Sequence, residues 1–222
     1  MTHLTSNQIW SQITRQAIIA ILPRDLPLND THMIADALAA TPVCAVQFVF
    51  HNALDWEIVR SWRQRSPAEM LLGLSSITTL PQAQAAIAAG AQFLSSFGYQ
   101  PTVHNYCQQH DILYLSGAAT FAEVQQAVQN NCTRIKLFVN KTGGFNYLRT
   151  MQAAFADCQF MPTGYINPDN IAQYAQANVP AIGIGRSIFG QPPYSMRAII
   201  SRARALQKKW DDHHPQYIHK PR

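Results

Sequence analysis

The chain has 222 residues, of which 47% are hydrophobic, so it is long enough to bury a sizeable core as one domain. No apolar stretch reaches the roughly 18 to 20 residues that a membrane span requires, and the first ten residues lack the basic-then-apolar pattern of a secretion signal. A membrane protein is therefore not expected, and the expected location is the cytoplasm.

The formal net charge is +5, but the twelve arginines and five lysines are spread along the chain. The densest basic segment, residues 197–209, is interpreted as the solvated outer face of a terminal helix, so nucleic-acid binding is not expected. The four cysteines are far apart, with no C-x-x-C motif and no histidines clustered near them, which argues against a metal site and a disulfide framework. Anionic small substrates remain compatible with the charge.

Short apolar runs alternate with amphipathic segments along the whole chain. A helix over 6–15, capped by Thr5 or Ser6, precedes the first strand. Strands are predicted at 17–22, 43–50, 70–74, 92–95, 112–115, 133–139, 159–161 and 181–184. The intervening helices are predicted at 31–40, 53–65, 80–89, 101–109, 121–130 and 145–156, then from Asn167-Pro168 onward, with a last helix ending at Trp210.

Eight strand-helix units of about 20 to 27 residues predict parallel strands, and eight such units close into a (β/α)8 TIM barrel. A doubly wound open sheet is the alternative, weakened because no G-x-G-x-x-G follows the first strand. The fold class predicted is α/β, as a single TIM-barrel domain over 1–210 with an extra N-terminal helix. Residues 211–222 are expected to form a flexible tail.

Lys136 stands in the middle of the sixth predicted strand, whereas the other four lysines lie in a polar loop or near the C-terminus. Since side chains alternate across a strand, Lys136 and Phe138 share one face, and Ile135 lies on the other. Burial would drive the amine toward its neutral form, which is a nucleophile. The alternative is a lysine at the strand's edge that extends to water.

In a barrel, chemistry gathers at the C-terminal ends of the strands. Gln47 and His51 share one strand face there, so both could project toward the cavity of Lys136. Gly164 and Gly185 would expose backbone N–H groups where barrels often hold phosphate, and Arg186 would add a cation.

Four segments carry a resemblance to a known family: residues 86–93 (AIAAGAQF), 116–120 (SGAAT), 135–138 (IKLF) and 162–168 (PTGYINP). The chain resembles the 2-keto-3-deoxy-6-phosphogluconate (KDPG) aldolases, which include the 4-hydroxy-2-oxoglutarate aldolases, over residues of about 18 to 188. The resemblance implies a compact (β/α)8 barrel, usually a homotrimer. No cofactor and no metal are expected. It also implies that Lys136 is the Schiff-base lysine.

The chain departs from the family at the catalytic positions. Where the family has a glutamate on the second strand that shuttles protons, this chain has Gln47. Where many members have a carboxylate-binding arginine four residues later, it has His51. The arginine usual at the end of the first strand is replaced by Pro23, with Arg24 next to it.

The binding positions also differ. The family's third-strand threonine is Ser76, and the proline after the lysine strand is Val139. The second glycine of its T-G-G motif is Tyr165, and the serine after the last strand's glycine is Arg186. The residues expected to bind substrate are Arg24, Ser76, Thr163, Gly164, Gly185 and Arg186.

The leading hypothesis is a class I aldolase that cleaves a 2-keto-3-deoxy sugar acid (phosphate) or a 4-hydroxy-2-oxo acid to pyruvate and an aldehyde. Lys136 would form the Schiff base, and His51 would shuttle protons through a water because the carboxamide of Gln47 does not titrate. The first alternative is a catalytically impaired homologue that binds ligands or partners. The second is a phosphate-binding barrel isomerase without a Schiff base.

Overall fold

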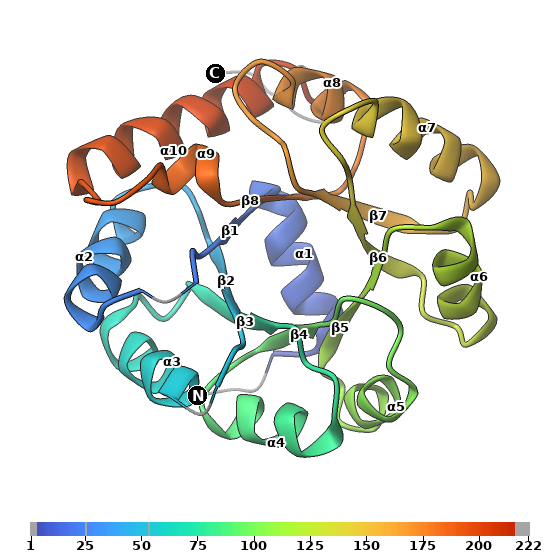
Figure 1. Ribbon diagram of the computed structural model, residues 1–222, viewed down its shortest axis with the longest axis horizontal. Coiled ribbons are helices and arrows are strands. Elements are labelled where there is room, and N and C mark those ends of the chain that lie inside the picture. The colour runs from blue at the N-terminus through green and yellow to red at the C-terminus, as the bar shows by residue number, and fades with distance from the viewer. Residues whose placement is uncertain (1–3, 25, 53, 216–222) are drawn as a thin grey trace.

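The computed structural model describes residues 4–24, 26–52 and 54–215, and its strands form one closed parallel barrel in sequence order (Figure 1). The strands are β1 (Ile18–Ile21), β2 (Ala45–Val49), β3 (Leu71–Ser75), β4 (Phe93–Ser95), β5 (Leu113–Ala118), β6 (Arg134–Phe138), β7 (Gln159–Thr163) and β8 (Ile182–Ile184). The ring closes where β1 pairs with β8, through Ile18 and Ile182. The TIM barrel predicted from the sequence is therefore confirmed, and the open-sheet alternative is wrong.

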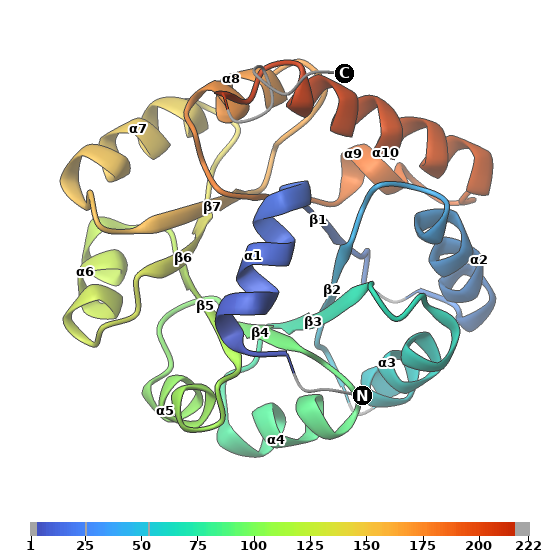
Figure 2. The ribbon, with the colours of Figure 1, turned by 180° about the vertical axis from the view of Figure 1, so that it is seen from behind.

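Helices surround the barrel and one helix crosses its end. They are α1 (Ser6–Gln16), α2 (Leu28–Ala39), α3 (Leu54–Arg65), α4 (Leu80–Ala88), α5 (Pro101–Gln109), α6 (Phe121–Gln129), α7 (Gly144–Ala154), α8 (Ile171–Gln176), α9 (Arg186–Phe189) and α10 (Met196–Asp211). Figure 2 shows α1 lying across one opening of the ring. No helix in the described part of the chain is both long and apolar enough to cross a membrane.

The crossing of α1 follows from its sequence. Thr5 caps the helix in a reciprocal pair with Gln8, and Ile9, Trp10 and Ile13 form its buried stripe. These three side chains pack in one cluster with residues from inside the barrel, among them Phe93. Because α1 enters β1 directly, it covers the end of the barrel where the strands begin, and the loops after the strands are left at the opposite end.

Some predicted boundaries differ from the structure. The helix expected from Asn167 begins at Ile171, because the Asn167 side chain accepts hydrogen bonds from two following backbone N–H groups and holds a turn there. The sequence predicted one last helix ending at Trp210. The structure has two helices there, the short α9 and then α10. The predicted helix start at Ala53 lies outside the described residues.

The expected C-terminal tail is partly described. Asp211 is the last residue of α10, and His214 is buried with its ring stacked on Trp210 at 5.1 Å between centroids. Residues 216–222 lie outside the described part of the chain.

Alternation along β6 decides what faces the barrel interior. Ile135 and Leu137 belong to the large core between the strands and the outer helices. Lys136 pairs in register with Gly117 of β5 and Met161 of β7, and Met161 belongs to the cluster inside the barrel. Since paired residues in a parallel sheet point to the same side, Lys136 points into the barrel.

Candidate active site

The Lys136 side chain is buried inside the barrel, with 3% of its surface exposed. Its Nζ donates a hydrogen bond to Oε1 of Gln47, at 2.5 Å, from a strand on the other side of the ring. The sequence analysis placed these two side chains at the same cavity, and the structure brings them together. A strand-edge lysine extending to water, the alternative weighed from the sequence, does not fit this burial.

Desolvation controls the charge of this amine. Burial lowers the pKa of Lys136 to about 7, because the charged form loses its hydration inside the barrel. Its partner Gln47 is a neutral amide, so it contributes no negative charge that would stabilise the ammonium. A large fraction of the molecules therefore carries a neutral, nucleophilic amine near neutral pH.

The amide nitrogen of Gln47 has a hydrogen-bond partner of its own. It is fully buried, and its Nε2 donates a hydrogen bond to Oγ of Ser95 at 3.1 Å. Ser95 is the last residue of β4 and is fully buried as well. The sequence analysis did not propose Ser95 as a site residue, and the signal available was its position, at the end of an apolar strand two residues after the inward-facing Phe93.

Aromatic rings line one wall beside the amine. The Nζ of Lys136 lies 5.5 Å from the ring centroid of Phe138, which is two residues along the same face of β6. Phe97 packs against Phe138 with 5.8 Å between ring centroids and is 52% exposed. The Phe138 ring therefore lies beside the buried amine, and the Phe97 ring that packs on it is exposed to solvent.

A hollow of about 680 Å³ lies at the ends of β7 and β8. It is lined by Thr163, Gly164, Gly185 and Arg186, as the sequence analysis predicted for substrate-binding residues, and also by Lys141. The hydroxyl of Thr163 is buried and has no hydrogen-bond partner within the described chain. Two cationic side chains and an unsatisfied hydroxyl are suited to an anionic group.

Arg24 and His51 line a second hollow, of about 280 Å³, between the loops after β1 and β2. Both side chains are exposed, and the backbone N–H of His51 donates to the carboxylate of Asp55 at 2.6 Å. Lys136 and Gln47 do not line this hollow. The structure thus places His51 in the same hollow as Arg24, and His51 takes no part in the hydrogen bonds that join Lys136, Gln47 and Ser95.

Ser76, the remaining predicted substrate residue, directly follows β3. Its backbone has φ of 65°, in the left-handed region, and its buried hydroxyl has no hydrogen-bond partner within the described chain. Buried polar groups are normally satisfied, so Ser76 and Thr163 are two hydroxyls at this end of the barrel that a ligand can satisfy.

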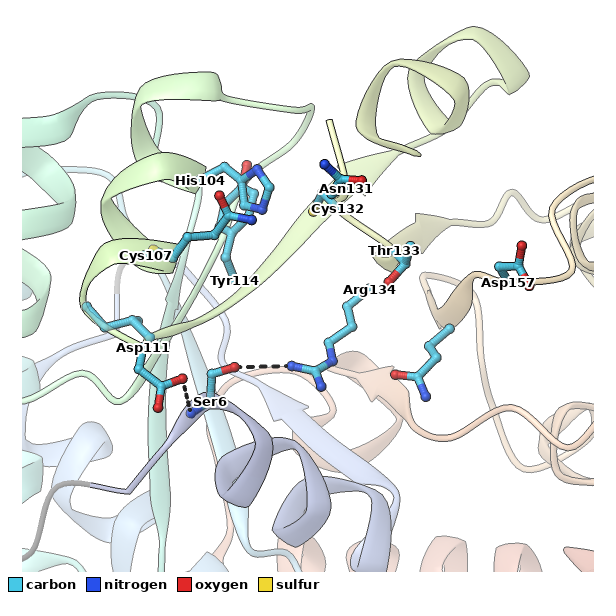
Figure 3. Close-up of a pocket in the computed structure, with 13 residues that line it drawn as sticks. Ser6, His104, Cys107, Asp111, Tyr114, Asn131, Cys132, Thr133, Arg134 and Asp157 are labelled. Atoms are coloured by element: carbon cyan, nitrogen blue, oxygen red, sulfur yellow. Dashed lines mark hydrogen bonds between the residues drawn. The ribbon is translucent and has the colours of Figure 1, made fainter. Parts of the chain in front are cut away.

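A third hollow, of about 650 Å³, lies at the opposite end of the barrel (Figure 3). Arg134 donates to Oγ of Ser6 there, and Oδ1 of Asp111 accepts from the Ser6 backbone. These bonds anchor the start of α1. None of the site residues predicted from the sequence lines this hollow.

The described residues contain no cluster of side chains suited to bind a metal ion. No three side chains of the His, Cys, Asp or Glu type come together there to hold an ion. The four cysteines are free thiols, and burial raises the pKa of Cys107 and Cys132 to about 12.

Comparisons with solved structures place the fold. A 2-keto-3-deoxy-6-phosphogluconate aldolase from Zymomonas mobilis superposes with a TM-score of 0.80 at 20% identity, covering 89% of this chain and 95% of that chain. A KDPG aldolase from Legionella pneumophila, solved with pyruvate captured as a covalent carbinolamine intermediate, gives a TM-score of 0.72 at 20% identity, covering 93% and 98%. At these identities the likeness concerns the fold.

Comparison with known sequences identifies the family as well as the fold. A 2-dehydro-3-deoxy-phosphogluconate aldolase from Treponema pallidum is 29% identical over 177 residues, 79% of this chain and 83% of the relative. The KHG/KDPG aldolase of Escherichia coli K12 is 26% identical over 152 residues, 68% of this chain and 71% of the relative. The sequence model of the family described as KDPG and KHG aldolase matches residues 9–192. With more than three quarters of its length matched, the chain belongs to the KDPG and KHG aldolase family.

Proposed function

We propose that this protein is a class I aldolase that forms a Schiff base through Lys136 and cleaves a 2-oxo acid to pyruvate and an aldehyde. The observation that carries the proposal is the buried Lys136 amine, whose pKa falls to about 7 at the inner wall of the barrel. A buried amine that is neutral near physiological pH is the group that Schiff-base chemistry requires. The family assignment supports the same reaction type.

The reaction begins when Nζ of Lys136 attacks the keto carbon of the substrate and forms a carbinolamine. Loss of water gives an iminium, and the bond between the third and fourth carbons then breaks, with its electron pair moving toward the iminium nitrogen. The hydroxyl on the fourth carbon loses its proton, and the aldehyde leaves. Protonation of the remaining enamine and hydrolysis release pyruvate and restore the lysine.

Each step needs proton transfers that Gln47 cannot make, because a carboxamide does not titrate near neutral pH. We assign them to His51 acting through a water, since an imidazole can both accept and donate a proton. Gln47 keeps a different role, which is to accept a hydrogen bond from the amine and orient it.

The substrate is a 2-keto-3-deoxy sugar acid phosphate or a 4-hydroxy-2-oxo acid. Arg24 and Ser76 would hold its carboxylate beside the reacting carbon. Thr163, Gly164, Gly185 and Arg186 would hold the distal phosphate or second carboxylate, in the hollow at the ends of β7 and β8. No cofactor takes part in this mechanism.

In this proposal the quaternary structure is a homotrimer, by analogy with the family, and the location is the cytoplasm, as expected from the sequence. Light scattering coupled to size-exclusion chromatography measures the first of these directly.

One observation favours a second candidate, a homologue that binds 2-oxo acids without turning them over. The residue hydrogen-bonded to the nucleophile is Gln47, and neither its amide nor the Ser95 hydroxyl titrates near neutral pH, so neither can act as a general acid or base. Such a protein would still form the Schiff base but would not release an aldehyde.

The deciding experiment is intact-mass spectrometry after incubation with pyruvate and sodium borohydride. We expect one reduced pyruvyl group per chain in the wild type and in Lys208→Met, whose lysine is exposed on α10, and none in Lys136→Met. An adduct combined with no cleavage of any 2-oxo acid supports the binding protein. A folded wild type without an adduct contradicts the Schiff base and leaves a barrel isomerase.

A further inference from the structure

The N-terminus of α7 opens onto a hollow of about 520 Å³ to which the proposed function assigns no role. Helices α7 and α8 are neighbours around the ring (Figure 1), and both contribute to its walls. The lining residues are Asn140, Lys141, Gly143, Gly144, Phe145, Asn146, Asn170, Gln173 and Tyr174. None of these side chains carries a negative charge, and Lys141 is a cation. The charge of this hollow therefore favours an anion.

The first turn of α7 has backbone N–H groups without partners. An α-helix leaves its first N–H groups without an acceptor inside the helix, and a side chain at the N-cap often supplies one. The N-cap here is Gly143, and no side chain caps this helix. The N–H groups of Gly144, Phe145 and Asn146 make no hydrogen bond within the described chain. These groups can only donate, and they lie at the helix end where the dipole favours negative charge.

A buried tyrosine hydroxyl also lacks a partner at this helix end. Tyr174 is 2% exposed and lines the hollow, yet its hydroxyl makes no hydrogen bond within the described part of the chain. The hydroxyl lies against α7, since a Cβ added to Gly144 would be 3.2 Å from the Tyr174 oxygen. The Tyr174 ring packs edge-on against Phe145, with 5.7 Å between centroids, which fixes the direction of its hydroxyl. Buried polar groups are normally satisfied, so a ligand in the hollow would supply the missing partner.

The protonation of Tyr174 suits a bound anion. Burial raises the pKa of Tyr174, because the phenolate would lose its hydration there. The phenol therefore keeps its proton near neutral pH and can donate it. A hydroxyl can also accept a hydrogen bond, so it does not by itself choose between ligands. The backbone N–H groups and the Lys141 ammonium only donate, and they make the site selective for an acceptor.

We propose that this hollow is a phosphate-binding site formed by the first N–H groups of α7, the Tyr174 hydroxyl and the Lys141 ammonium. A helix N-terminus is a common binding site for phosphate. A phosphate group has at least three acceptor oxygens, enough for donors that come from the helix end, from α8 and from the loop before α7, whereas a carboxylate has two. The ligand is inorganic phosphate or the phosphate of a small monoester, since both present this group.

This site is separate from the hollow at the ends of β7 and β8. Lys141 and Asn170 line both hollows. Arg186 lines the hollow at the ends of β7 and β8 but not this one, and Tyr174 lines this one but not that one. Variants of Arg186 and Tyr174 therefore distinguish phosphate bound at the two places.

Amide NMR detects this binding at its site, because the proposed donors are backbone N–H groups. The full-length protein, labelled with ¹⁵N, is titrated with sodium phosphate at neutral pH and constant ionic strength, and in a second series with glycerol 3-phosphate. We expect the amide resonances of Gly144, Phe145 and Asn146 to shift together and to saturate. Saturation with both ligands identifies a monoester site, and saturation with phosphate alone identifies a site for the free ion. Tyr174→Phe, which removes only the hydroxyl, should weaken binding about 10-fold or more, the value of a hydrogen bond to a charged group.

A negative charge placed in the hollow gives a result that misfolding cannot imitate. Asn146→Asp keeps the side-chain shape, and a carboxylate in the first turn should stabilise α7 while it repels phosphate. We expect the saturating shifts to be lost and the free energy of unfolding to be unchanged or higher. Gln125→Glu is the matched control, because it adds the same charge to an exposed position of α6 that does not line the hollow. It should bind phosphate like the wild type.

Arg186→Met removes a cation from the neighbouring hollow and should leave the amide shifts of α7 unchanged. Shifts that do not saturate in the wild type, or that saturate equally in Asn146→Asp, would overturn the proposal. So would weaker binding in Arg186→Met with none in Tyr174→Phe, since the phosphate would then lie at the ends of β7 and β8. The readout needs no aldolase turnover, so a failure of the proposed function leaves this test intact.

Discussion

A buried amine faces a buried amide in this barrel, with Nζ of Lys136 and Oε1 of Gln47 2.5 Å apart. A carboxylate at the Gln47 position would favour the ammonium, because an opposite charge nearby stabilises the charged form. The amide lacks that charge, and burial lowers the pKa of Lys136 to about 7. The glutamine thus favours a reactive amine and gives up a group that could move protons.

The first prediction concerns the pH dependence of Schiff-base formation. The amine is neutral above its pKa of about 7, so the rate of pyruvate imine formation should rise with pH and level off above pH 8. Stopped-flow absorbance or cyanoborohydride trapping with a short reaction time measures it. A rate that continued to rise to pH 10 would mean that the amine keeps the pKa of an exposed lysine.

The second prediction concerns stability. The unfolded chain takes up the Lys136 proton below the usual value of 10.5, but the folded chain does so only below about 7. As pH falls from 10.5 to 7 the unfolded state binds more protons, so the folded state loses up to about 5 kcal/mol, and this deficit then stays constant at lower pH.

Lys136→Met should therefore be more stable than the wild type by about 2 to 5 kcal/mol at pH 6.5, and the gain should shrink toward pH 10. Guanidinium unfolding at the two pH values measures it. Lys208→Met, which replaces an exposed lysine paired with Asp212, is the control and should change stability little at either pH. An equal gain at both pH values for Lys136→Met would point to packing and not to charge.

The third prediction restores a titrating group beside the nucleophile. Gln47→Glu should raise the pKa of Lys136 through the nearby carboxylate and add a general acid-base group at the reacting carbon. Turnover of 2-oxo acid substrates should increase by roughly 100-fold, with the optimum moved to higher pH. Gln47→Met, of similar length and without a titrating group, should not increase turnover. Steady-state kinetics across pH distinguishes these variants.

The barrel and the nucleophile were readable from the sequence because both depend on local pattern. Eight apolar runs at regular spacing predict the strands, and a single lysine inside one run stands out. Ser95 could not be recognised, since its hydrogen bond is with an amide from β2 that lies 48 residues away. The turn at Asn167 was missed because side-chain capping of the backbone there competes with helix formation.

The fourth prediction concerns Gly183, which lines the hollow at the ends of β7 and β8. A Cβ added to Gly183 would lie 2.4 Å from Oγ1 of Thr163 and 2.7 Å from Cδ1 of Ile21. Gly183→Ala should therefore destabilise the fold by about 1 to 3 kcal/mol and displace the Thr163 hydroxyl, raising KM for a phosphorylated substrate. Gly98→Ala is the matched control, because its Cβ would meet no atom within 4 Å. Equal stabilities of the two variants, measured by guanidinium unfolding, would contradict the crowding at Gly183.

The fifth prediction concerns His51, which lines the same hollow as Arg24, between the loops after β1 and β2. If its imidazole moves protons through a water, His51→Ala should lower kcat by roughly 100-fold while leaving the borohydride adduct with pyruvate intact. The two readouts separate because the trapped adduct accumulates over a long incubation even when its proton transfers are slow, whereas kcat reports the slowed turnover. In the proposed mechanism the Arg24 guanidinium binds the substrate carboxylate and transfers no proton, so Arg24→Ala should instead raise KM. An unchanged kcat in His51→Ala would remove this histidine from the mechanism and leave the proton transfers to water or to the substrate itself.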